Sequence, residues 1–150
     1  MKTDFILEVA IQQLRNNFLL TEIEAEEIKK IDKAAYEKTM YSLDKINLKY
    51  KNKYYEGELN PFNAVMYCQY LYRLSNEAYK LNLIKIAEKI YYLNKMLNSV
   101  ELFYAVNLPK IWSCEHPLGS VFGRAQYGDY FFFYQGCTVG GNGGHEGGGY

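Results

Sequence analysis

The segment SVFGRAQYGDYFFFYQGCTVGG, residues 120–141, contains a repeat of bulky residues and glycines. Bulky apolar residues recur every five or six positions, at Phe122, Tyr127, Phe133 and Val139. Three of them are followed directly by a glycine, namely Gly123, Gly128 and Gly140. This spacing fits neither the two-residue period of a strand nor the 3.6-residue period of a helix. It is typical of a coiled β-solenoid, in which a bulky side chain fills the corner of each rung and glycine allows the tight turn beside it.

Upstream of this repeat, the first 98 residues have the periodicity of helices. The apolar stripe expected on the first helix consists of Phe5, Ile6, Val9, Ile11 and Leu14. Thr21 followed by Glu24 has the form of a capping box, which predicts a second helix over residues 22–46. The many Glu and Lys residues of this second helix are expected to form its solvated face.

Two further helices are expected after a break at Gly57. Asn60 is the predicted N-cap of the third helix, with Pro61 at its first position and the helix extending over residues 61–80. The fourth helix is expected over residues 82–97. One face of the third helix should pack in a core or a subunit interface, and it carries Tyr67, Tyr70, Leu71 and Leu74.

The helical period ends near residue 98. Pro109 and Pro117 follow close together, and no regular helix accommodates both. We therefore expect an α+β chain in two parts, a helical domain over residues 1–98 and the first coils of a β-solenoid over residues 99–150. The aromatic run YFFFY, residues 130–134, places five large rings in succession within the repeat. Something large is expected to pack there, either the helical domain or another subunit.

Composition and charge argue against several classes of function. The 150 residues contain 17 basic and 17 acidic side chains with no long run of one sign, which argues against capture of nucleic acid or of an anionic membrane surface. No apolar run has the length of a membrane span, and the first residues become charged too early for a signal peptide. The three cysteines are an odd number without a close pair, which favours a reducing cytoplasm.

Two motifs near the repeat resemble the serine acetyltransferases of the left-handed β-helix, or hexapeptide-repeat, superfamily. EHPLGSVFG, residues 115–123, is similar to the family's motif acidic-His-x-x-Gly-x-Val-φ-Gly, where x is any residue and φ is an apolar one. YQGCTVGG, residues 134–141, is similar to a rung with Gln, two residues, Thr, an apolar residue and two glycines. The family also has a helical amino-terminal domain before its solenoid, which is the layout expected for this chain. The order of elements agrees over residues 60–150, and the specific motifs lie within residues 115–141.

The resemblance implies an acetyl transfer from acetyl-CoA to the hydroxyl of L-serine, with His116 as the general base. A serine hydroxyl is too weak an acid to ionise near neutral pH, so a base within hydrogen-bond reach contributes about 10²–10⁴ in rate. Histidine has its pKa in the required range. The resemblance also implies that acetyl-CoA is a co-substrate and that no metal takes part.

Two acidic residues match positions where the family has aspartate. Glu101 lies fifteen residues before His116, about one solenoid turn away, where the family's acid orients the histidine. Glu115 stands where the family's acid helps to hold the serine ammonium group. Both are one methylene longer than aspartate, so the two roles are expected with shifted geometry.

The glycine-rich stretch GGNGGHEGGG, residues 140–149, lacks the Lys-Ser/Thr ending of a nucleotide-binding loop. The resemblance places Gly140 and Gly141 beside the arm of CoA, where glycine allows close approach of the backbone. The family binds the serine carboxylate with Arg and His, and the matching positions here are Gly149 and Tyr150, which supply no cation. Tyr150 is retained as a substrate-binding residue, and another small acceptor in place of serine is an open alternative.

The resemblance further implies a homotrimer or a dimer of trimers, with CoA bound between neighbouring solenoids. A non-catalytic interpretation stays open, because family members continue through several more coils. In that interpretation the chain is a fragment, or a helical oligomerisation module with an exposed rung edge. Separately from that question, His116 could be a structural corner residue bonded to the backbone, and Glu101 and Glu115 could simply be solvated. A zinc site formed by Cys114, His116, Cys137 and His145 is disfavoured, because no pair other than Cys114 and His116 is closely spaced.

Overall fold

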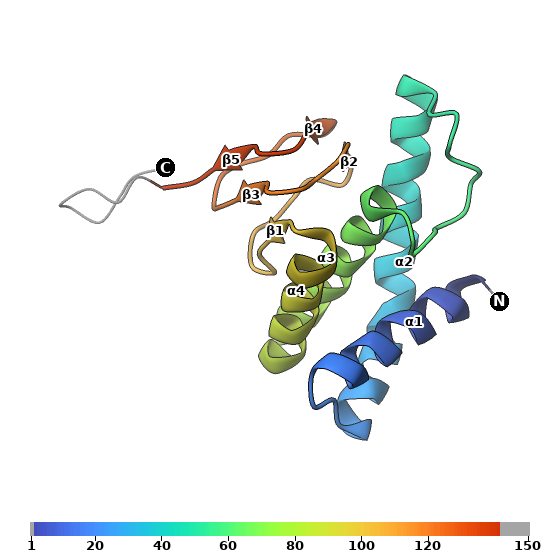
Figure 1. The fold of residues 1–150 in the computed structure, drawn as a ribbon, viewed down its shortest axis with the longest axis vertical. Coiled ribbons are helices and arrows are strands. Elements are labelled where there is room, and N and C mark those ends of the chain that lie inside the picture. The colour runs from blue at the N-terminus through green and yellow to red at the C-terminus, as the bar shows by residue number, and fades with distance from the viewer. Residues whose placement is uncertain (1, 142–150) are drawn as a thin grey trace.

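Helices occupy the first part of the chain and short strands the second, in the order that the periodicity predicts (Figure 1). The computed structural model describes residues 2–141. Within them the helices are α1 (Lys2–Asn17), α2 (Glu22–Tyr50), α3 (Ala64–Lys80) and α4 (Ile84–Asn98). The strands are β1 (Glu101–Leu102), β2 (Trp112–Cys114), β3 (Val121–Phe122), β4 (Phe131–Phe133) and β5 (Thr138–Val139). The change from helix to strand falls after Asn98, as expected.

The start of α2 confirms the predicted capping box. The Thr21 hydroxyl accepts a hydrogen bond from the Glu24 backbone N–H at 3.1 Å, and the Glu24 carboxylate accepts one from the Thr21 N–H at 3.0 Å. These two bonds satisfy donors that a helix otherwise leaves free at its first turn. The helix runs to Tyr50, four residues beyond the expected end, and stops where Lys51 adopts a left-handed conformation.

The start of α3 corrects the prediction of Asn60 as its cap. Asn63 is the N-cap, and its side chain accepts from the N–H groups of Val65 and Met66 at 3.0 and 3.3 Å. The Asn60 side chain instead accepts from the Phe62 N–H at 2.8 Å. The Asn60 carbonyl accepts from the Asn63 N–H, so Pro61 lies in a turn before the helix.

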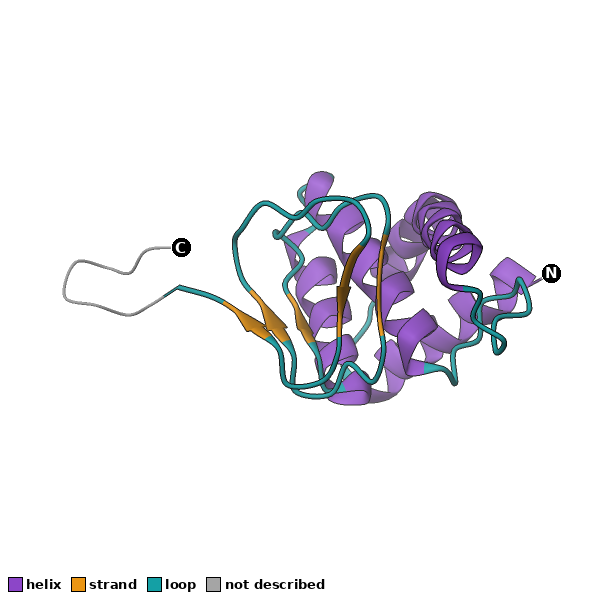
Figure 2. Cartoon of the chain, turned by 90° about the horizontal axis from the view of Figure 1, so that it is seen from above, coloured by secondary structure: helices purple, strands orange, loops and turns teal. Residues whose placement is uncertain are grey.

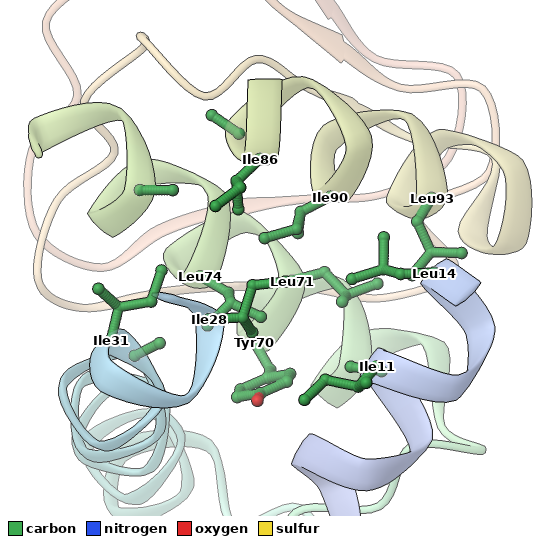
Figure 3. Packing of buried hydrophobic residues seen from close by; sticks show 14 of the residues in the cluster. Ile11, Leu14, Ile28, Ile31, Tyr70, Leu71, Leu74, Ile86, Ile90 and Leu93 are labelled. Atoms are coloured by element: carbon green, nitrogen blue, oxygen red, sulfur yellow. The ribbon is translucent and has the colours of Figure 1, made fainter. Parts of the chain in front are cut away.

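The helices enclose one apolar core (Figure 3), to which every helix contributes. The predicted face of α3 is confirmed, with Tyr67, Tyr70, Leu71 and Leu74 buried. The predicted stripe of α1 is wrong at Phe5, which is 50% exposed. Residues spaced four apart lie above one another on a helix, so the buried line of α1 runs through Ile6, Ala10 and Leu14.

The strands pair in parallel across successive returns of the chain (Figure 2). One sheet has the order β1-β3-β5 and the other is β2-β4. Glu101 pairs with Val121 and Val121 pairs with Thr138 in the first sheet, while Trp112 pairs with Phe131 in the second. The chain therefore comes back alongside itself after 17 to 20 residues. Helix α1 lies at the end of the molecule away from these coils (Figure 1).

The interior of the coils holds two of the four predicted corner residues. Phe122 and Phe133 are buried, whereas Tyr127 is half-buried and Val139 is 37% exposed. Trp112, which the repeat did not mark, is fully buried and stacks on Phe133 with ring centroids 6.1 Å apart.

The predicted turn glycines are also corrected. The glycines in the left-handed conformation among the coils are Gly119 and Gly136, not Gly123, Gly128 or Gly140. The Gly119 N–H donates to the Ser99 carbonyl at 2.7 Å, and the Gly136 N–H donates to the Leu118 carbonyl at 2.9 Å. The turns that need glycine are therefore those that bond one coil to the previous one.

The aromatic run at residues 130–134 packs on the end of α2, which confirms that the helical part covers this rung. The Phe132 ring lies edge-on to Tyr50 with centroids 5.8 Å apart, and the Lys49 ammonium lies 4.4 Å from the centre of the Tyr130 ring. Deeper in the same junction, the Ser42 hydroxyl donates to the Trp112 carbonyl at 2.8 Å and accepts from its N–H at 2.9 Å.

Candidate functional site

His116 lies on an exposed corner directly after β2. The Glu115 N–H donates to the Phe133 carbonyl at 3.0 Å, which extends the β2-β4 ladder by one residue. At His116 the backbone turns into the left-handed region, with φ 49°. That conformation costs a residue with a Cβ atom about 1–2 kcal/mol, so the surrounding turn must hold it in place. The imidazole is exposed and free to meet a ligand from solvent.

Glu101 lies on β1, in register with Val121 of the following coil. Its carboxylate accepts a hydrogen bond from the Tyr91 hydroxyl at 2.8 Å and one from the Lys95 ammonium at 2.8 Å. These two donors from α4 lower the pKa of Glu101 against the opposing effect of partial burial. The carboxylate is therefore ionised near neutral pH.

The structure brings the backbone of Glu101 and the turn of His116 together, but not their side chains. The Glu101 N–H donates to the Ser120 carbonyl at 2.9 Å, and the Ser99 carbonyl accepts from the Gly119 N–H. Over residues 2–141, no hydrogen bond joins the Glu101 carboxylate to the His116 ring. Sequence reasoning missed Tyr91 and Lys95 as partners. Their signal was spacing, since both lie on one face of the helix that leads into β1.

Glu115 is half-buried and borders two adjoining hollows beside the end of α2. The volumes are about 130 Å³ and 520 Å³. Both hollows are lined by Ile46, Asn52, Tyr54, Ser113 and Glu115. The larger one adds the aromatic rings of Tyr50, Phe132 and Tyr134.

The smaller hollow contains a second acceptor besides the Glu115 carboxylate. The Asn47 side-chain oxygen is buried there and has no hydrogen-bond partner within the described residues. A buried acceptor without a donor is costly, and in native proteins such a group commonly meets a water or a ligand. A carboxylate and an unpaired amide oxygen together suit a group with several N–H donors, such as an ammonium. His116 follows Glu115 directly in the chain.

The residues predicted for CoA and for the acceptor carboxylate are placed only in part. Gly140 and Gly141 are exposed after β5, and a Cβ atom added at Gly140 would have only the Thr138 methyl within 4 Å, at 3.9 Å. A ligand could thus approach this backbone closely. Tyr150 and the matched position Gly149 lie outside the described residues, as does His145.

Residues 2–141 contain neither a metal-binding cluster nor a membrane-spanning helix. No three His, Cys, Asp or Glu side chains in this range are grouped so that they could hold a metal ion. No helix in the same range combines the length and the apolar character needed to cross a bilayer. Cys114 of the disfavoured zinc set is buried with its sulfur 3.8 Å from that of Cys68, whereas His116 is exposed.

No protein-family model and no curated protein matches the sequence. Solved structures do match the fold. A truncated serine acetyltransferase in its apoenzyme form superposes with a TM-score of 0.70 at 15% identity, covering 95% of this chain and 61% of that one. The serine acetyltransferase of Vibrio cholerae superposes with a TM-score of 0.68 at 15% identity, covering 93% and 56%. The resemblance inferred from residues 115–141 is confirmed at the level of fold, and this chain spans less than two thirds of either structure.

Proposed function

We propose that this chain is an acetyl-CoA-dependent O-acetyltransferase that acts on L-serine. Residues 1–98 would be its helical domain and residues 99–150 the first coils of its left-handed β-helix. The observation that carries the proposal is the fold shared with two serine acetyltransferases. In this chain the motif of residues 115–123 begins at an exposed corner, beside a hollow that Glu115 lines. An assembly as a homotrimer or a dimer of trimers in the cytoplasm is part of the same proposal.

His116 would act as the general base. Its ring takes the proton from the acceptor hydroxyl while that oxygen attacks the carbonyl carbon of the thioester. The C–S bond then breaks, and the imidazolium returns its proton to the departing CoA sulfur. An exposed ring on a corner suits this role, because both reactants can reach it from solvent.

Glu101 would be the positioning acid on the adjacent coil. Its lowered pKa keeps it charged. Its carboxylate bonds to Tyr91 and Lys95 and not to the His116 ring, so this role requires a change of partner when the substrates bind. Glu115, with the Asn47 oxygen beside it, would hold the ammonium group of the acceptor. Gly140 and Gly141 would give the arm of CoA close access to the backbone, and Tyr150 remains a predicted contact of the acceptor.

The test is the release of CoA thiol from acetyl-CoA with and without L-serine. We expect serine-dependent release, and a loss of about 10²-fold or more in His116→Ala. Leu118→Ala is the matched control, because Leu118 is an exposed residue of the same corner with no proposed role. Serine-dependent release that His116→Ala leaves intact would contradict the assignment of the base.

The second candidate is a helical oligomerisation module, in which the chain assembles without acetyl transfer. Sedimentation of the chain as a stable trimer, without thiol release on serine or on other small alcohols and amines, would favour this candidate. Release on another acceptor but not on serine would keep the transferase and point to the missing cation at Gly149 and Tyr150.

A further inference from the structure

A hollow of about 470 Å³ lies between α2, α3 and the loop that leads into β2. It is separate from the hollows beside Glu115, with which it shares no lining residue. Its size falls in the range of sites for small organic ligands. Apolar walls come from Tyr41, Leu108 and Pro109. The charged part of the lining has four basic residues and two acidic ones, namely Lys38, Arg73, Lys80, Lys110, Glu37 and Glu77.

Arg73 is the buried basic group of this hollow. The residue is 6% exposed, and one end of its guanidinium donates to the Lys110 carbonyl at 3.0 Å. Its Nε atom is buried without a partner in the described part of the chain. Burial lowers the pKa of Arg73 to about 10, so the group is still charged near neutral pH. A buried charge with unused donors is unfavourable unless a partner meets it.

Within residues 2–141 no carboxylate forms an ion pair with this charge, and Glu77 attracts it only through space. Glu77 is the acid one turn away on α3, and its carboxylate is held by the ammonium groups of Lys38 and Lys80. Glu37 lies near Lys33, at 3.9 Å. Arg73 forms no ion pair with any residue in 2–141, and neither does Lys110 at the rim. The charges left uncompensated around the hollow are therefore both positive.

We propose that this hollow binds a small organic oxyanion, a carboxylate or phosphoryl group on an apolar body, with Arg73 as its main ligand. The planar guanidinium presents paired donors that match the oxygens of such groups. Lys110 at the rim adds a second charge, and the tyrosine, leucine and proline side chains contact the apolar body. The site does not depend on the transferase function, since none of its residues belongs to that site.

The only tryptophan of the chain reports on the site. Trp112 is buried, and the Arg73 guanidinium lies 6.0 Å from the centre of its ring. An anion that binds Arg73 changes the field at this ring and hence its emission. The experiment titrates the folded chain separately with inorganic phosphate and with benzoate at constant ionic strength. Trp112 fluorescence and the thermal midpoint are measured at each concentration.

We expect a saturable change with at least one probe at millimolar concentration. Saturation by phosphate alone identifies a phosphoryl site, and saturation by benzoate alone identifies a carboxylate site. Arg73→Met keeps an apolar stem of similar length and should abolish the response. Lys110→Gln should weaken binding at least threefold, because it removes the rim charge from an exposed position.

Lys85→Gln is the matched control, since Lys85 is an exposed lysine outside the hollow. Its dissociation constant should equal that of the unmodified chain. If Arg73→Met does not fold, the dissociation constants of Lys110→Gln and Lys85→Gln for the probe still test the proposal. Three results would overturn the proposal: no saturable response to either probe, an undiminished response in folded Arg73→Met, or equal affinity in the unmodified chain and in Lys110→Gln.

Discussion

Buried polar side chains find partners far away in the chain. The Tyr70 hydroxyl in the helical core donates to the Asp32 carboxylate at 2.5 Å, which links α3 to α2. The Tyr72 hydroxyl accepts from the Leu108 N–H at 2.9 Å in the loop before β2. Such bonds satisfy groups that would otherwise be costly to bury. They also make individual residues sensitive to changes of charge.

We predict that Asp32→Asn is at least as stable as the unmodified chain at neutral pH. Asp32 is 7% exposed, and burial raises its pKa above the ordinary 3.8 despite the bond from Tyr70. The folded state therefore binds this proton more tightly than the unfolded state. The stability that the protonated Asp32 carboxyl contributes is lost as the pH rises through its raised pKa, and Asn has no such loss because it does not titrate. The gain in the free energy of unfolding should therefore be larger at pH 7 than at acidic pH.

Urea denaturation at pH 3.5 and at pH 7 measures this difference. Asp44→Asn is the control, because Asp44 also accepts from a tyrosine hydroxyl, that of Tyr55, but is exposed. The advantage of Asp32→Asn over the unmodified chain should grow from pH 3.5 to pH 7. An advantage that shrinks over this interval would show that Asp32 is better accommodated as a carboxylate than its burial implies.

Among the elements, local signals in the sequence predicted helices well and their exact starts less well. The sequence predicts the capping box at Thr21 correctly, because both halves of the motif lie within one turn. At the start of α3, Asn60 and Asn63 are both good caps, and Pro61 supported the wrong one. The choice depends on a turn that brings α3 against α2, and this packing is not a local property of the sequence.

We predict that Asn63→Ala lowers stability by about 1 kcal/mol, with an upper limit of about 2 kcal/mol. The Asn63 side chain satisfies two N–H groups of the first turn of α3, whereas Asn60 satisfies one N–H in an exposed turn. Asn60→Ala is thus the matched control and should cost less. Chemical denaturation followed by circular dichroism gives both values, and the reverse order would restore Asn60 as the cap.

On the scale of the whole molecule, helices and coils share one junction. A second apolar cluster joins Cys68 and Tyr72 of α3 to Trp112, Phe122 and Phe133 of the coils. That the chain returns alongside itself was predictable from residues 120–141, but of the four marked positions only Phe122 and Phe133 are buried. Trp112 and the contacts of Glu101 with α4 were not predictable, because they arise where the first coil meets helices that precede it in sequence.

We predict that Ser42→Ala destabilises the whole chain by about 1–3 kcal/mol. It leaves both the N–H and the carbonyl of buried Trp112 without their shared partner on α2. Ser75→Ala is the control, since the buried Ser75 hydroxyl bonds only to the Tyr72 carbonyl within α3. Tryptophan fluorescence and far-ultraviolet circular dichroism should give coincident transitions in both variants. Separate transitions in the unmodified chain would mean that helices and coils unfold independently.

The left-handed backbone at residue 116 lowers the stability of the fold at the position of the proposed catalytic base. The backbone there favours glycine, yet the chain carries an imidazole at that point. His116→Gly and His116→Ala should be equally inactive, but the glycine variant should be about 1 kcal/mol more stable, because only alanine retains the steric conflict. Thermal denaturation compares the two, and equal midpoints would show an unstrained corner. If His116 is the proposed base, the residue that best suits this backbone is one that cannot perform the reaction, so the simplest stabilising substitution at this corner would also remove the activity.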